Sequence, residues 1–262
     1  MSKDQTSIIK NLLEVTPPGE YDLAFRDLQI ICQNTSIPSI PQNTRLTWLE
    51  KKYTPVKIDD HYAIICKEAR VSNLGEYIDP VTFQLFTITL DPLVVQKNES
   101  VAQAQNSPTR QQYQDTFSKY VKTAYNSEAA AGVYPKADGF SIILVGVSVN
   151  LKNFRTGSVI GNYSIENEKV NGKISSIQHF YESGNAICEH ISKISATFQP
   201  GDANDLLNCI SEFESSWLSS LTQTLDRIFS TEMNKLRRKL PVTATKINWE
   251  AELRGVGGMG GY

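Results

Sequence analysis

The sequence predicts an α+β fold with three parts in order. We expect an N-terminal antiparallel helical stalk, a five-stranded antiparallel meander sheet, and one long C-terminal helix that covers the sheet and leads into an extended, amphipathic tail. Apolar residues recur at helical spacing near the N-terminus, at strand spacing from about 130 to 198, and at helical spacing again after Pro200-Gly201. With 262 residues, 40% of them hydrophobic, and a net charge of −2, the chain is long enough to bury a core.

The helical stalk is assigned to residues 1–58. Pro17-Pro18-Gly19 ends the first helix, and Pro38 and Pro41 separate the second from the third. Each predicted helix carries apolar residues three and four positions apart, namely Ile8, Ile9, Leu12 and Leu13, then Ala24, Phe25, Leu28, Ile31 and Cys32, then Leu46, Leu49 and Tyr53.

Residues 59–107 are harder to assign and are expected to form a small mixed globule. YAIIC and FQLFTITL are typical of strands, whereas the polar stretch QKNESVAQAQNS, residues 96–107, predicts a loop. Pro108 suits the first turn of a helix, because that position needs no backbone N–H.

The region 108–200 is expected to contain this helix and the sheet. Its strand-like segments are AGVYP, FSIILVGVSVN, SVIGNYSIE, KISSIQHFYE and NAICEHISKISATF. Asn171-Gly172 predicts a type I′ hairpin turn, which needs positive φ at both central residues, and Ser183-Gly184-Asn185 predicts a second turn.

The long helix is assigned to 201–240 and the tail to 241–262. A helix from about 205 to 239 would be roughly 50 Å long, whereas five strands side by side span only about 24 Å. We therefore expect its apolar stripe to extend past the chain's own sheet, and a second subunit that continues the sheet would cover it.

Catalytic and metal-binding signatures are weak. The GVGGMG near the C-terminus lacks the strand and helix that a dinucleotide fingerprint requires. His61, His179 and His190 have no cysteine or carboxylate at metal-ligand spacing, so they are expected to be structural or surface histidines. No nucleophile is paired with a base, which argues against an enzyme. The N-terminus lacks a secretory signal pattern, and we expect a cytoplasmic protein.

A basic cluster is the strongest functional signal. Lys235, Arg237, Arg238, Lys239 and Lys246 fall within KLRRKLPVTATKINW, residues 235–249, and the next carboxylate is Glu250. One or two cations would simply complement the negative end of a helix, but five indicate a surface for an acidic partner. That partner is an acidic protein, a phosphoinositide membrane bound by a non-catalytic scaffold, or, least favoured because the remaining chain is acidic, nucleic acid.

Two blocks of sequence resemble a known family, the alpha subunit of F-actin capping protein (CapZ-type). HFYESGN at 179–185 is similar to the family's strand–turn element HYYEDGN, and 235–249 is similar to its tail LRRxLPVTRTKIxW. Weaker matches are PPGEY at 17–21, TPVKI at 54–58, Asp79-Pro80 and Lys152-Asn153-Phe154.

The resemblance implies an obligate heterodimer in which a beta subunit completes the sheet. It implies calcium-independent capping of actin filament barbed ends in the cortical cytoskeleton, regulation by phosphoinositides and capping-protein regulators, and neither metal nor nucleotide cofactor. Together with the basic pattern it gives the expected actin-binding residues, which are Lys235, Arg237, Arg238, Lys239, Leu240, Lys246, Ile247 and Trp249.

The chain also departs from the family pattern in its tail. Ala244 replaces an arginine of the motif, Asn234 occupies a commonly basic position, and glycine follows soon after Leu253. The family's NFWNGRW element reads NFRTGSVIGNY at 153–163. We expect the tail to contribute less affinity here than in other members of the family.

Overall fold

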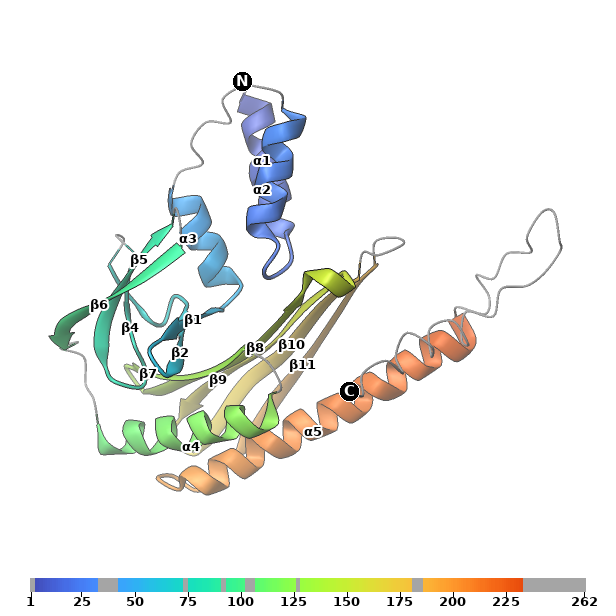
Figure 1. Cartoon of the computed structure of the whole chain (residues 1–262). Coiled ribbons are helices and arrows are strands. Elements are labelled where there is room, and N and C mark those ends of the chain that lie inside the picture. The colour runs from blue at the N-terminus through green and yellow to red at the C-terminus, as the bar shows by residue number, and fades with distance from the viewer. Residues whose placement is uncertain are drawn as a thin grey trace. The chain divides into compact units, whose positions relative to one another are not determined.

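The computed structural model divides the chain into two compact units, residues 1–209 and 210–262, each of which is described by itself. Its antiparallel sheets and C-terminal helix confirm the predicted α+β class. Figure 1 shows the elements. The structure describes residues 3–32, 42–72, 75–90, 93–101, 107–125, 128–180 and 186–232.

The first unit begins with the three predicted helices, α1 (Lys3–Val15), α2 (Tyr21–Ile31) and α3 (Gln42–Lys51) (Figure 1). The predicted break at Pro17-Pro18-Gly19 forms the turn between α1 and α2. Gly19 has φ +80°, and a Cβ at this position would collide with the side chain of Val149. This turn therefore requires glycine and packs against the end of a sheet strand.

The helical part ends earlier than residue 58. Thr54–Ile58 forms strand β1, which pairs with β2 (His61–Ile65) in an antiparallel hairpin. The next four strands, β3 (Arg70–Ser72), β4 (Glu76–Ile78), β5 (Gln84–Leu90) and β6 (Leu93–Val101), form a second antiparallel sheet in that order. The loop predicted at 96–107 is therefore wrong over its first half, because β6 is a polar strand at the edge of this sheet.

Helix α4 (Pro108–Ala124) starts as predicted, with Pro108 in its first turn and Ser107 accepting a hydrogen bond from the Arg110 backbone N–H. Gln114 is fully buried and fixes the helix to the sheet. Its amide donates to the Ala131 carbonyl over 2.8 Å, and its carbonyl oxygen accepts from the Val133 N–H over 2.8 Å.

The large sheet confirms the predicted five-stranded antiparallel meander, in the order β11-β10-β9-β8-β7. Its strands are β7 (Glu128–Lys136), β8 (Gly139–Asn150), β9 (Arg155–Glu166), β10 (Lys169–Phe180) and β11 (Ala186–Thr197), and a short 3₁₀ helix, η1 (Leu151–Asn153), follows β8. One face of β7 and β8 shares a hydrophobic core with α1–α3 and the β1–β2 hairpin.

The hairpin turn predicted at Asn171-Gly172 is wrong, because both residues lie inside β10. The turn is at Asn167-Glu168, where Asn167 has φ +54°. Gly172 has a different purpose, since a Cβ there would collide with the Asn162 carbonyl oxygen and the Tyr163 ring on β9. The other predicted turn, Ser183-Gly184-Asn185, lies outside the described residues.

Helix α5 (Ala203–Arg227) begins in the first unit, continues into the second, and is followed by a π-helical segment, η2 (Ile228–Glu232). Its 25 residues span about 37 Å. Strands β8–β11 have 12 residues each, or about 40 Å, which is longer than the ten residues assumed from sequence. The helical run from α5 through η2 is described only as far as Glu232. The rest of the predicted helix, residues 233–239, lies outside the described part of the chain, so the expected overhang stays a prediction.

Candidate interaction surfaces

The actin-binding residues expected from sequence lie outside the described part of the chain. The second unit is described only as far as Glu232, three positions before Lys235. Nothing in the structure therefore tests the positions of Lys235, Arg237, Arg238, Lys239, Leu240, Lys246, Ile247 and Trp249.

The open edge of the large sheet is a candidate interface within the first unit. Strand β11 pairs with β10 through twelve residue pairs, and it is the last strand of the sheet. Ile187 and Ile191 on this strand are 54% and 60% exposed. A long edge strand with exposed apolar side chains is a site for pairing with another strand.

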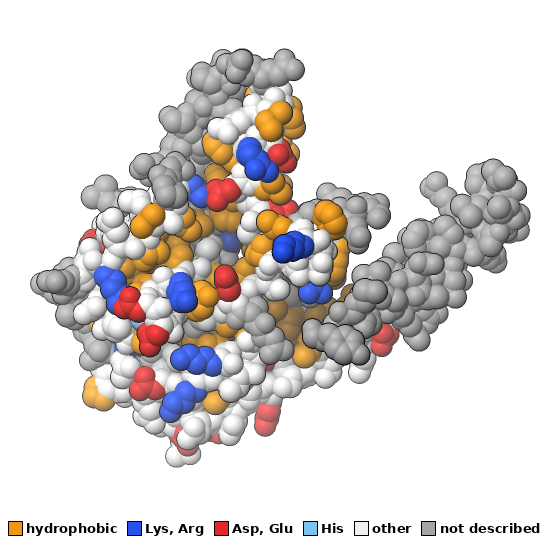
Figure 2. Space-filling model, in the orientation of Figure 1, with side chains coloured by type: hydrophobic (Ala, Val, Ile, Leu, Met, Phe, Trp, Pro, Cys, Tyr) orange, Lys and Arg blue, Asp and Glu red, His pale blue; other side chains and the backbone are white. Residues whose placement is uncertain are grey.

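The stalk helices expose a second apolar surface. In α1, Ile9 and Leu13 are buried, but the neighbouring Ile8 and Leu12 are 57% and 48% exposed. The exposed apolar residues of α1 and α2, which we call the stalk stripe, are Ile8, Leu12, Val15, Ile30 and Ile31. Figure 2 shows hydrophobic side chains on the surface of the stalk. Two apolar surfaces on one unit indicate a partner protein.

A buried polar junction connects the stalk to the sheet. Glu20, at the start of α2, accepts hydrogen bonds from the Thr156 hydroxyl over 2.5 Å and from His179 Nδ1 over 2.9 Å. All three residues are buried, Thr156 completely. The carboxylate therefore ties α2 to the neighbouring strands β9 and β10 and fixes the position of the stalk on this face.

The sequence-based interpretation missed this junction. It placed Glu20 in PPGEY and His179 in HFYESGN, two motifs that match the same family, but 159 positions separate the two residues. The signal in the sequence that could have indicated this contact is that both residues lie in motifs that match the same family. His179 has the structural role expected of it.

A second buried carboxylate organises the turn at Asp79-Pro80. Asp79 accepts hydrogen bonds from the Thr82 hydroxyl over 2.6 Å and from the Val81 N–H over 3.0 Å, and it lies 2.9 Å from His61 Nε2. Burial opposes its ionisation, but these hydrogen bonds hold the pKa of Asp79 below its ordinary value. The hydrogen bond to Asp79 raises the pKa of His61 against the effect of burial.

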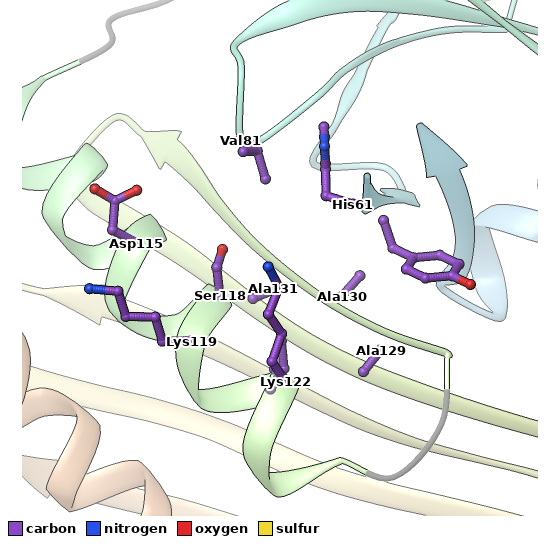
Figure 3. A pocket seen from close by; sticks show the side chains of 11 residues that line it. His61, Val81, Asp115, Ser118, Lys119, Lys122, Ala129, Ala130 and Ala131 are labelled. Carbon is purple, nitrogen blue, oxygen red and sulfur yellow. The ribbon is translucent and has the colours of Figure 1, made fainter. Parts of the chain in front are cut away.

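A cavity of roughly 290 Å³ lies beside His61. Figure 3 shows Asp115, Ser118, Lys119 and Lys122 of α4 on one side of this cavity, with Ala129–Ala131 of β7 and His61 of β2 around it. Both ring nitrogens of His61 are already bonded, to Asp60 and to Asp79, so this histidine is not available as a general base.

The part of the chain that the structure describes contains neither a metal-binding cluster nor a membrane-spanning helix. No group of three His, Cys, Asp or Glu side chains in that part of the chain could hold a metal ion. No helix within the same ranges is long and apolar enough to span a membrane.

Comparison with known proteins confirms the resemblance seen in the sequence. The family model of the F-actin capping protein alpha subunit matches residues 9–256. The F-actin-capping protein subunit alpha of Schizosaccharomyces pombe is 29% identical over 252 residues, which cover 92% of this chain and 94% of the relative. That of Eremothecium gossypii is 28% identical over 254 residues, which cover 93% and 92%.

The fold also matches a solved structure. The structure of the homodimeric actin capping protein alpha subunit from Plasmodium berghei superposes with a TM-score of 0.70 at 19% sequence identity. The match covers 92% of this chain and 99% of that chain.

Proposed function

Because this chain belongs to the F-actin capping protein alpha subunit family, we propose that it is the alpha subunit of a heterodimer that binds actin filament barbed ends. It blocks addition and loss of actin subunits by occupying the end, without covalent chemistry, and its action does not depend on calcium. It works in the cytoplasm, at the cortical actin cytoskeleton.

The open β11 edge is the observation that carries this proposal. A beta subunit that pairs a strand with β11 would extend the sheet at this edge and cover Ile187 and Ile191. The stalk stripe would be covered by helices of the same partner. Obligate interfaces are larger and more hydrophobic than transient ones, so burial of both apolar surfaces by one subunit is consistent with an obligate heterodimer.

The basic tail supplies the contact with actin. Positive charge steers the complex toward an acidic filament end. Arg237 and Arg238 pair with carboxylates through two parallel hydrogen bonds, a geometry that lysine does not offer. Leu240, Ile247 and Trp249 pack as an amphipathic segment into an apolar groove of actin, while Lys235, Lys239 and Lys246 add charge around it.

The same basic cluster favours one alternative. A non-catalytic scaffold could use these cations to bind a phosphoinositide membrane surface, since each lysine or arginine near an anionic leaflet contributes about 1 kcal/mol. In the capping account, phosphoinositides and capping-protein regulators compete with actin for this segment.

Elongation from filament seeds tests the proposal. The chain is co-expressed with a beta subunit, and the complex is added to seeds and pyrene-labelled actin in calcium and in a calcium chelator. We expect barbed-end growth to stop in both conditions. Growth at the rate of the untreated seeds, together with flotation of the complex on phosphoinositide liposomes, would support the scaffold instead.

A further inference from the structure

Strand β7 lies at the opposite edge of the large sheet from β11, and most of this edge is blocked by side chains. Gln114 of α4 bonds to the Ala131 carbonyl and the Val133 N–H, each over 2.8 Å, as the peptide group of a neighbouring strand would. Arg110 donates to the Val133 carbonyl over 3.2 Å, and Pro135 has no N–H to offer. Such features protect an edge strand from unwanted pairing.

The first residues of the same edge are left open. The backbone groups of alternate residues in an edge strand point outward. Because those of Ala131 and Val133 point outward, those of Ala129 do so as well. The N–H and carbonyl of Ala129 and the N–H of Ala131 have no strand partner in the described part of the chain. Ala129–Ala131 line the cavity beside His61, so an extended peptide that enters this cavity can pair with β7.

The two sides of the cavity follow from the packing of α4. Tyr113 of α4 contacts Phe140 edge to face, with ring centroids 5.6 Å apart, and Phe140 lies directly opposite Pro135. Directly opposite residues share a face of the sheet. Helix α4 therefore covers the face that carries the side chains of Ala129 and Ala131, whereas the other face of β7 packs against the β1–β2 hairpin. A strand added to β7 would have one face toward α4 and the other toward β2.

The α4 side of the cavity is positively charged. Lys119 and Lys122, one turn apart and both exposed, line the cavity. Among the described residues, no carboxylate lies within ion-pair distance of either lysine, and Lys122 acts on Asp60 only at longer range. Asp115 accepts a hydrogen bond from Gln111 over 2.9 Å and lies farther along α4 than Lys122 (Figure 3). An acidic side chain on this side would therefore be attracted.

We propose that the cavity binds a short, extended, acidic segment of a partner protein, which adds antiparallel to the open end of β7. Antiparallel pairing matches the rest of the sheet and is more stable per residue than parallel pairing. The residue opposite Ala129 exchanges two backbone hydrogen bonds with it and directs its side chain toward α4. This residue is therefore Glu or Asp and pairs with Lys122, while the alternate residues, which face β2, are apolar. Gln114 ends the pairing after Ala131 and keeps the segment short.

Fluorescence anisotropy with a defined peptide tests the proposal. The full chain, purified with a beta subunit, is titrated against acetyl-Glu-Val-Glu-Val-Glu-Val-amide that carries a dye at its carboxyl end. We expect saturable binding with a Kd below about 1 mM. Lys122→Glu should weaken binding at least about tenfold, because it removes a charged contact and adds repulsion. Lys67→Glu, at an exposed position in the turn after β2 and outside the cavity, is the matched control and should change the Kd less than about twofold.

Two further comparisons address the backbone pairing. Ala129→Pro removes one outward N–H and should weaken binding by about fivefold. Proline already occupies the outward position 135 of this strand, so the strand accommodates it there. Methylation of the Glu nitrogens of the peptide removes the N–H groups that bond to β7 and should weaken binding at least about tenfold. Methylation of the Val nitrogens, which point away, should leave the Kd within about threefold of the parent peptide.

The methylated peptides are compared on the unchanged protein, so that test does not depend on the folding of a variant. Equal binding of the two methylated peptides would mean simple charge attraction and would overturn the proposed strand pairing. An unchanged Kd in Lys122→Glu, or no saturable binding up to about 1 mM peptide, would overturn the site itself. The inference uses neither β11 nor the basic tail, and it stands or falls independently of barbed-end capping.

Discussion

Removal of the charge at the stalk junction should destabilise the protein measurably. Glu20 accepts its two hydrogen bonds, from Thr156 and His179, in a buried setting. A hydrogen bond to a charged group contributes about 1.5–3 kcal/mol, and one between neutral groups about 0.5–1.5 kcal/mol. Glu20→Gln keeps the size of the side chain but replaces two hydrogen bonds to a charged carboxylate by two weaker hydrogen bonds to a neutral amide. We therefore expect a loss of about 2 kcal/mol in the free energy of unfolding.

Urea unfolding at one fixed protein concentration measures this loss, because association with a partner would otherwise shift the apparent stability. Glu14→Gln is the matched control, since Glu14 is an exposed stalk residue whose ion pair with Lys51, 3.4 Å long, should contribute less than about 1 kcal/mol. In a double-mutant cycle, Glu20→Gln and Thr156→Val should be coupled by about 1 kcal/mol. If Glu20→Gln unfolds at the same urea concentration as Glu14→Gln, the junction does not hold the stalk.

Three further predictions concern the tail and one buried pair. Reversal of Arg237 and Arg238 to Glu should weaken barbed-end capping by well over tenfold, since each charged contact contributes about 1.5–3 kcal/mol; an unchanged capping constant in pyrene-actin assays would exclude their role. Ala244→Arg should tighten capping in the same assay, and no change would mean that the tail docks differently. His61→Gln should lower the free energy of unfolding by about 1.5–3 kcal/mol at pH 5.5. Asp79 raises the pKa of His61 in the folded protein. This stabilisation is therefore complete below the pKa that His61 has in the unfolded chain, and it is lost as the pH rises through the pKa that His61 has in the folded protein. The difference between wild type and variant should therefore be smaller at pH 8.5, and an equal difference at both pH values would refute the linkage.

The secondary structure was predictable where packing follows a simple period. Short apolar segments separated by turn signals, such as FSIILVGVSVN, predicted the meander sheet, and the prolines at 17 and 18 predicted the end of α1. Helical spacing alone did not reveal that Ile9 and Leu13 face the core whereas Ile8 and Leu12 face outward, since that depends on what packs against the helix.

The errors have identifiable physical causes. Gly172 was assigned to a turn because of its freedom at positive φ, but it is needed for close approach to Asn162 and Tyr163. Residues 96–101 of β6 were assigned to a loop because they are mostly polar, and an edge strand tolerates polar side chains on both faces. Strand length was underestimated, because β8–β11 each have 12 residues where about ten were assumed, and the overhang of the helix past the sheet stays a prediction.

Long-range contacts were the least predictable part of the candidate sites. The junction of Glu20 with His179 depends on the fold bringing α2 onto β9 and β10, which no local pattern encodes. The exposure of β11 follows from its place at the end of the sheet order. The basic cluster at 235–249 was evident from sequence alone, and its contact with actin stays a prediction.

Observation of single filaments tests the central claim most directly. The purified heterodimer is added to growing filaments whose two ends are told apart by their growth rates, and the free actin is then washed out. The account predicts that barbed ends stop growing, and do not shorten after the wash, while pointed ends behave as before. If barbed ends in saturating complex grow and shorten at the same rates as barbed ends without complex, the account is contradicted.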